Sequence, residues 1–193
     1  MTDKPIIYVD ADDVLIDLLG SVIDFIKTED GFQYERAVFT KDDFFSSINR
    51  SDLRFKWKDM IDRGGYVYNL PENSGARTAI DILRERFIIH PATAPLYSCE
   101  KWMFERAKWL HDRMDFPYRD QIHSAAKYRL CGDVLIDDRV SNLSAFHVTN
   151  PNALLIIFDQ PWNANEKGPW VRAKSMAEVV KIVEGAWPSQ HPR

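Results

Sequence analysis

The sequence feature that most constrains the fold is a short apolar run that ends in a cluster of acidic residues. Residues 6–9 (IIYV) are apolar at every position, a pattern typical of a strand buried on both faces of a parallel sheet. Asp10, Asp12 and Asp13 follow directly. Apolar residues then recur at spacings of three and four, which predicts a helix over roughly residues 15–27. We therefore expect the acidic cluster at the carboxyl end of a buried strand, where open α/β sheets bind ligands.

Acidic residues before a helix have two interpretations. A single Asp commonly caps free N–H groups and interacts favourably with the helix dipole. Three neighbouring carboxylates, however, repel one another unless a cation or a proton lies between them. Because Mg²⁺ prefers hard oxygen ligands, we favour a Mg²⁺ or phosphoryl site over a helix cap at this point.

Apolar runs alternate with helical patterns along the rest of the chain. The predicted strands after the first are residues 87–89, a weak strand at Ile122, residues 134–136 and residues 153–158. The predicted helices between them are residues 76–86 and 101–113, and a last helix opens at a Ser175–Glu178 capping box. This alternation predicts an α/β fold with a doubly wound parallel sheet, as in Rossmann-like proteins.

Residues 28–70 differ in character from the rest of the chain. They hold nine aromatic residues among charged ones, and no long strand-like run. Within them, residues 51–63 predict a helix that a Gly-Gly pair ends. We therefore expect two parts: an α/β core made of residues 1–27 and 71–193, and a small helical cap made of residues 28–70 over the carboxyl end of the sheet.

The bulk composition excludes several classes of protein. Hydrophobic residues make up 45% and charged residues 28% of the 193 residues, which is ordinary for a globular domain with or without an insertion. The net charge of −4 argues against electrostatic binding to a nucleic-acid polymer, because such proteins normally present a basic surface.

The sequence also indicates the cellular compartment of the protein. No apolar run approaches the roughly 18 residues of a membrane span, and the first ten residues lack the basic stretch and apolar segment of a signal peptide. Cys99 and Cys131 have neither CxxC nor metal-ligand spacing, so we expect free thiols in a reducing compartment. These features predict a cytoplasmic protein without membrane association, and a homodimer is compatible with them.

Polar residues follow several of the predicted strands. Thr93 comes after the second strand, Lys127 after Ile122, and Asp137 with Asp138 after the run 134–136. Each alone has an ordinary interpretation, since a Thr caps helices and a Lys is usually solvated. The carboxyl ends of parallel strands point the same way, however, so we expect these residues to converge with the first acidic cluster.

Such a set suits hydrolysis of a phosphomonoester. One carboxylate can attack phosphorus and form an aspartyl-phosphate, and a second can protonate the leaving oxygen and then activate water. A strand-end Asp pair can hold Mg²⁺, while a Lys and a Thr hydroxyl bind phosphoryl oxygens. The predicted partner is thus a small phosphorylated molecule.

These motifs resemble those of the haloacid dehalogenase superfamily, and within it the 5'(3')-deoxyribonucleotidases. Residues 10–17 (DADDVLID) resemble their DMDGVLAD, and residues 92–95 (ATAP) resemble their CTSP. Lys127 with residues 135–139 (LIDDR) resembles their K…LLIDDR.

The resemblance implies roles for the acidic residues. Asp10 is expected to be the nucleophile and a Mg²⁺ ligand. Asp12 is expected to be the general acid and base, and to lend its backbone carbonyl to the metal. Asp138 is the expected direct Mg²⁺ ligand of the strand-end pair, with Asp137 supporting it.

The resemblance also implies the substrate contacts. Thr93, Ala94 and Lys127 are expected around the phosphate, and Trp57 and Phe44 of the cap are expected to stack on a nucleotide base. An equally weighted alternative is that the cap aromatics serve packing alone.

Several positions depart from the pattern of the deoxyribonucleotidases. Asp13 stands where many members have Gly, Leu18 replaces an aromatic residue, Ala94 a Ser and Ala125 an Arg. The leading hypothesis is a Mg²⁺-dependent phosphatase acting on (deoxy)ribonucleoside monophosphates. The alternatives are a phosphatase of the same fold with another small phosphorylated substrate, and a catalytically silent nucleotide-binding relative.

Overall fold

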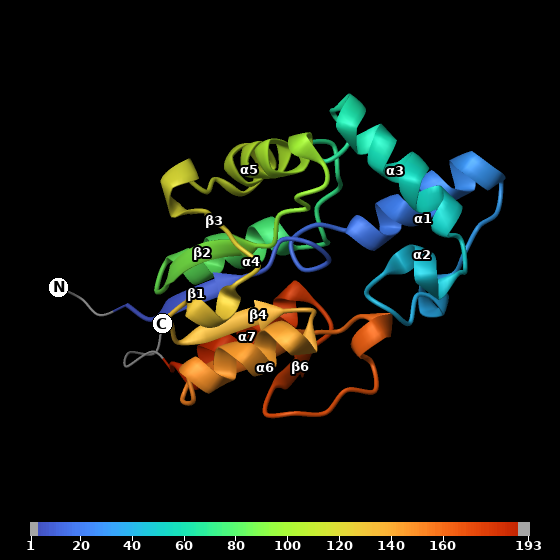
Figure 1. Cartoon of the computed structure of the whole chain (residues 1–193). Coiled ribbons are helices and arrows are strands. Elements are labelled where there is room, and N and C mark those ends of the chain that lie inside the picture. The colour runs from blue at the N-terminus through green and yellow to red at the C-terminus, as the bar shows by residue number, and fades with distance from the viewer. Residues whose placement is uncertain (1–3, 189–193) are drawn as a thin grey trace.

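The sheet is the centre of the computed structural model, which describes residues 4–188 (Figure 1). Its six strands are all parallel and lie in the order β3-β2-β1-β4-β5-β6. In chain order they are β1 (Ile6–Val9), β2 (Ile88–Thr93), β3 (Ile122–His123), β4 (Val134–Asp137), β5 (Leu154–Phe158) and β6 (Val171–Ala173). The prediction of a doubly wound parallel sheet is confirmed.

Seven α-helices and four short 3₁₀ helices lie between residues 4 and 188. The α-helices are α1 (Leu18–Asp30), α2 (Phe44–Ser47), α3 (Ser51–Arg63), α4 (Ala76–Arg84), α5 (Glu100–Met114), α6 (Val140–Thr149) and α7 (Met176–Ala186). The 3₁₀ helices are η1 (Arg36–Val38), η2 (Tyr118–Asp120), η3 (Lys127–Arg129) and η4 (Pro161–Asn163). None of these helices combines the length and the apolar character of a membrane span.

The central strands are buried on both faces, as their unbroken apolar runs predict. Ile7 and Val9 of β1 pack into the core shared with α4 and α7, whereas Tyr8 between them packs with Leu135 and Phe146 on the α6 side. Helices therefore cover the two faces of the sheet, with α6 on one and α4 and α7 on the other (Figure 1).

Helix α1 begins three residues later than predicted, because the chain first folds back on itself. The backbone N–H groups of Leu15 and Ile16 both donate to the carbonyl of Ala11, each at 2.9 Å. Asp17 then caps the helix by accepting from the N–H of Gly20 at 3.0 Å. This tight turn holds the acidic cluster between β1 and α1.

The segment from α1 to α3 lies beyond the carboxyl ends of the strands (Figure 1). Helix α3 has the predicted bounds and ends at Gly64, whose φ of +90° suits glycine. Its buried residues are Leu53, Trp57 and Ile61, which share one face at helical spacing. The aromatic-rich segment thus has an apolar interior and borders the strand ends that carry the acidic residues.

Candidate active site

Three carboxylates meet where β1 and β4 end. The strands are neighbours in register, and the N–H of Asp10 donates to the carbonyl of Ile136 at 2.9 Å. This pairing places Asp10 beside Asp137 and Asp138, and one carboxylate oxygen from each lies within 4.8 Å of the others. All three residues are buried. The predicted convergence of these strand ends is present in the structure.

Lys127 lies among these carboxylates and is itself buried. Its Nζ is 2.9 Å from Oδ1 of Asp10 and 2.6 Å from Oδ2 of Asp137. Burial alone would lower the pKa of this amine, but the charges of Asp10 and Asp137 raise it above its usual value. Lys127 is therefore a fixed cation at the floor of the site.

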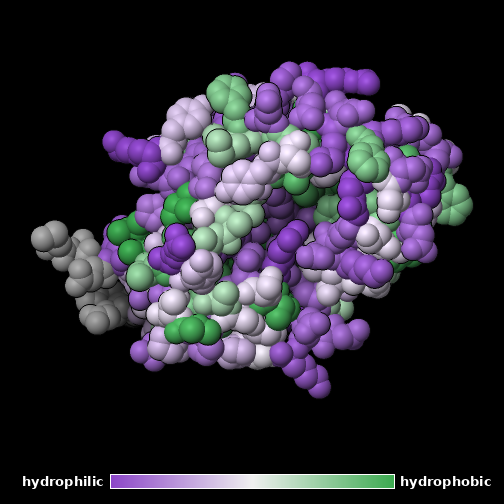
Figure 2. Space-filling view, viewed as in Figure 1, coloured by the Kyte–Doolittle hydropathy of each residue, from purple (hydrophilic) through white to green (hydrophobic). Residues whose placement is uncertain are grey.

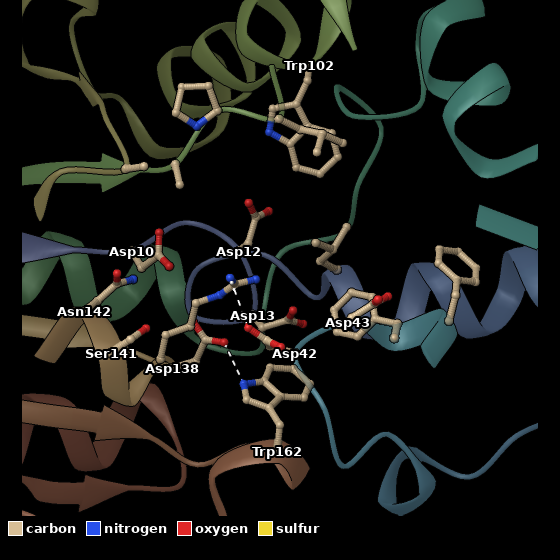
Figure 3. Close-up of a pocket in the computed structure, with 18 of the residues that line it drawn as sticks. Asp10, Asp12, Asp13, Asp42, Asp43, Trp102, Asp138, Ser141, Asn142 and Trp162 are labelled. Carbon is tan, nitrogen blue, oxygen red and sulfur yellow. Dashed lines mark hydrogen bonds and ion pairs between the residues drawn. The ribbon is translucent and has the colours of Figure 1, made fainter. Parts of the chain in front are cut away.

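The two members of the strand-end pair have different surroundings. Both oxygens of Asp137 are engaged: they accept from Lys127, from the backbone N–H of Arg139 at 2.8 Å, and from Nδ2 of Asn142 at 3.0 Å. Asp138 accepts from Nε1 of Trp162 at 2.9 Å, through Oδ2 (Figure 3). Oδ1 of Asp138 is thus the oxygen of this pair that is most available as a metal ligand.

The charge balance of the cluster favours a cation. Burial raises the pKa of Asp137 and Asp138, and for Asp138 the charges of Asp137 and Asp10 raise it further. One Lys127 amine cannot balance three buried carboxylates. Because the donors are closely spaced hard oxygens, the residues present fit a divalent cation such as Mg²⁺.

The neighbours Asp12 and Asp13 point in different directions. Asp12 borders a cavity and forms an ion pair with Arg106 of α5. Asp13 is buried, accepts from the N–H of Leu19 at 2.8 Å, and has a φ of +57°. Its burial raises the pKa of its carboxyl to about 8. Asp13 therefore occupies a left-handed turn position, a conformation that favours Gly.

Thr93 ends β2, the neighbour of β1 on the other side from β4. It is buried, and its hydroxyl has no hydrogen-bond partner within residues 4–188. A buried hydroxyl without a partner is uncommon in proteins. An oxyanion bound beside Asp10 could satisfy it.

A cavity of about 510 Å³ opens above the carboxylates. Figure 2 shows a hollow in this face of the molecule with hydrophilic residues in it, and Figure 3 shows side chains from the aromatic-rich segment and from the rest of the chain around it. Asp10, Asp12 and Asp138 line the cavity from the core, with Ala94 beside them. Thr93, Lys127 and Asp137 are buried and are not among the lining residues.

The predicted stacking residues Phe44 and Trp57 also line this cavity. Each is mostly buried and contacts other aromatic rings: Phe44 lies 5.5 Å from Trp162, and Trp57 lies 5.6 Å from Phe45 and 5.9 Å from Trp102, between ring centroids. Packing and ligand contact are therefore compatible for both residues.

Two contacts join the aromatic-rich segment to the core across the cavity. Arg139, which precedes α6, forms an ion pair with Asp42 at 3.4 Å. Trp162 of η4 faces Phe44 and donates to Asp138. Because the same indole touches both the segment and the carboxylate of Asp138, it connects their positions.

Four residues of this site were not predicted from the sequence: Arg106, Arg139, Asn142 and Trp162. Trp162 follows the strand 154–158 within the segment DQPWN, so the strand-end argument could have found it. Asn142 lies in the first turn of α6, close to the strand-end pair. Arg106 lies within α5, where no sequence signal relates it to Asp12.

The fold is that of the haloacid dehalogenase-like hydrolases, as two solved structures show. The HAD-hydrolase YfnB from Bacillus subtilis bound to magnesium matches with a TM-score of 0.56 at 12% identity, over 93% of this chain and 98% of that chain. A haloacid dehalogenase-like hydrolase from Burkholderia xenovorans matches with a TM-score of 0.60 at 12% identity, over 95% and 98%. At such low identity the likeness shows the fold alone.

The sequence specifies the family further. A sequence model of the family "5' nucleotidase, deoxy (Pyrimidine), cytosolic type C protein" matches residues 4–186, and the chain belongs to this family. It is 25% identical over 181 residues to the 5'(3')-deoxyribonucleotidases of Bacillus subtilis (strain 168) and of Bacillus phage SPbeta, across 92% of this chain and 98% of each relative. The resemblance seen in the motifs is confirmed, and the chain is a phosphatase of the nucleotidase type.

Proposed function

We propose that this protein is a Mg²⁺-dependent phosphatase that hydrolyses (deoxy)ribonucleoside monophosphates through an aspartyl-phosphate. The observation that carries the proposal is the meeting of Asp10, Lys127, Asp137 and Asp138 below a cavity that Asp12 borders. The names of the family and of its two Bacillus relatives support the substrate class.

Asp10 is the proposed nucleophile. Its carboxylate oxygen forms a bond to phosphorus as the ester oxygen leaves, and Asp12 gives that oxygen a proton. Asp12 then takes a proton from water, whose oxygen attacks phosphorus and releases inorganic phosphate and free Asp10. Lys127 and Thr93 hold phosphoryl oxygens, beside the backbone of Ala94.

The metal role falls to the acidic residues around Asp10. Asp10, Asp138 and the backbone carbonyl of Asp12 would hold Mg²⁺, and Asp137 would support them because its own oxygens already accept from Lys127 and Asn142. When bound, Mg²⁺ offsets the repulsion between the anionic nucleophile and the anionic phosphate.

Residues 28–70 are the proposed cap. Phe44 and Trp57 line the cavity from this segment, so a flat base attached to the phosphate could lie against them. The rest of the chain forms the α/β core that holds the phosphate. We also propose a cytoplasmic location, which the family description and the free thiols of Cys99 and Cys131 support.

A second candidate function is a phosphatase of the same fold with another small phosphorylated substrate. Leu18, Ala94 and Ala125 replace an aromatic residue, a Ser and an Arg of the resembled motifs, and all three line the cavity. Relative to the resembled motifs, the cavity wall therefore lacks a hydroxyl at position 94 and a guanidinium at position 125. A catalytically silent relative is less favoured, because both Asp10 and Asp12 are present.

The test is a phosphate-release screen with and without Mg²⁺. Deoxyribonucleoside and ribonucleoside monophosphates are compared with sugar phosphates and p-nitrophenyl phosphate. The proposal expects Mg²⁺-dependent release that is fastest with a nucleoside monophosphate. Faster release from a sugar phosphate would favour the second candidate, and no release from any substrate would contradict both.

A further inference from the structure

Arg106 is a buried cation beside the active site. It lies in the middle of α5 with none of its surface exposed, and its guanidinium forms an ion pair with Oδ1 of Asp12. The ring of Trp102, one turn earlier in α5, lies 5.0 Å from the guanidinium carbon. Nε and Nη1 of Arg106 have no hydrogen-bond partner within the described part of the chain.

The ion pair of Arg106 is weak evidence of a role in stability alone. A buried charge is costly to desolvate, and apolar side chains often replace buried ion pairs without loss of stability. Within residues 4–188 the carboxylate of Asp12 is the one acidic partner of Arg106. The burial of this guanidinium is therefore best explained by what it does to Asp12.

Asp12 in turn depends on Arg106. Its side chain is 22% exposed at the cavity wall, and across residues 4–188 no other group donates a hydrogen bond to its carboxylate. Because Arg106 engages Oδ1, it fixes the rotation of the carboxyl group. Oδ2 then remains free to exchange a proton inside the cavity.

We propose that Arg106 is a positioning residue that aims Asp12 at the ester oxygen of the substrate. The inference rests on the proposed function, since it requires Asp12 to protonate the leaving group. It predicts that the importance of Arg106 depends on the leaving group. A nucleoside leaves as an alkoxide and needs the proton, whereas p-nitrophenolate leaves readily without one.

The experiment compares kcat/KM of wild type, R106Q and R106K on a deoxyribonucleoside monophosphate and on p-nitrophenyl phosphate. This quantity reports the step in which the ester bond breaks. For R106Q we expect a loss of about 100-fold on the nucleotide and of less than about 10-fold on the aryl phosphate, following the usual size of acid catalysis. R106K keeps the charge and should recover part of the loss on the nucleotide.

The matched control is R84Q. Arg84 stacks on Phe116 at 4.3 Å and donates to the carbonyl of Met114 at the end of α5, so this change disturbs the same helix away from Asp12. R84Q should reduce kcat/KM for the two substrates equally or not at all.

A second measurement uses the D12N background. If Arg106 acts through Asp12, adding R106Q to D12N should not slow phosphorylation of Asp10 by p-nitrophenyl phosphate any further.

Two outcomes would overturn the inference: equal losses on both substrates in R106Q, or a further loss in the D12N background. A wild-type protein inactive on both substrates would instead contradict the proposed function.

Discussion

At the residue scale, the same type of side chain has different environments within one site. The five residues concerned are Asp10, Asp12, Asp13, Asp137 and Asp138. Asp10 contacts Lys127, Asp137 is enclosed by donors, and Asp138 keeps a free oxygen. The neighbours of each carboxylate therefore determine its role. Hydrogen bonds and nearby charges decide whether the carboxylate can attack, bind metal or remain structural.

Asp10→Asn should abolish phosphate release and leave the melting temperature near that of wild type. The amide cannot attack phosphorus, so a loss of more than about 1,000-fold is expected. The change removes one of three clustered negative charges, so the fold should tolerate it. Phosphate release and thermal unfolding are the measurements. Retained turnover with an unchanged melting temperature would show that Asp10 is not the nucleophile.

Asp138→Ala should raise the Mg²⁺ concentration needed for half-maximal activity by about tenfold or more, because losing a coordinating oxygen weakens metal binding. Asp159→Ala is the matched control, since Asp159 also follows a strand but pairs with Arg172 at 2.6 Å outside the cluster. The measurement is a Mg²⁺ titration of phosphate release. Equal half-saturation in wild type and Asp138→Ala would exclude Asp138 as a direct ligand.

The sequence could place the residues that follow a predicted strand within a few positions, because their position relative to a strand end is local information. Thr93, Lys127 and the strand-end Asp pair are of this kind. Arg106 could not be placed, since its contact with Asp12 joins residues 94 positions apart through the packing of α5. Such contacts depend on tertiary structure, which periodicity does not encode.

At the element scale, the strong strands and the weak strand at Ile122 were predicted, whereas strand β6 and helix α6 were not. The strand β6 has three residues, of which one is buried, so no apolar run marks it. Helix α6 buries only Leu143 and Phe146, and its pattern is too sparse to indicate a helix. Both elements form because neighbouring strands and the sheet face provide contacts.

The turn that joins β1 to α1 requires a positive φ at Asp13, and the energetic cost of this conformation can be tested. Asp13 adopts a φ of +57°, which costs an ordinary residue about 1 kcal/mol and costs Gly nothing comparable. Asp13→Gly and Asp13→Ala both lose the bond to the N–H of Leu19, so they differ chiefly in backbone strain. Asp13→Ala should be less stable than Asp13→Gly by about 1 kcal/mol, measured by denaturant unfolding. Equal stabilities would show that the turn relaxes in the variants.

At the scale of the whole molecule, the core and the proposed cap meet around the cavity. Across the cavity they are joined by the Arg139–Asp42 ion pair and the Phe44–Trp162 contact. The sequence predicted a helix over residues 51–63 of this segment. It did not predict these contacts, because they depend on how the segment lies against the strand ends. A bound substrate would contact both the core and the proposed cap at this junction.

Trp57→Ala tests whether the proposed cap binds the base of a nucleotide by stacking. If Trp57 stacks on it, KM for a nucleoside monophosphate should rise by about 5- to 100-fold, corresponding to about 1–3 kcal/mol of stacking. KM for p-nitrophenyl phosphate should change far less, since this small substrate reaches Asp10 without a base platform. Steady-state kinetics on both substrates provide the measurement.

The control for Trp57→Ala comes from the same helix. Phe55 is 70% exposed on α3 and is not among the cavity-lining residues, so Phe55→Ala should leave both KM values unchanged. Trp57 also packs on Phe45 and Trp102, so its loss will lower stability, and the kinetics must be measured well below the melting temperature of the variant. If KM rises equally for both substrates, Trp57 shapes the cap by packing. The preference for nucleotides would then have to arise from another part of the cavity wall.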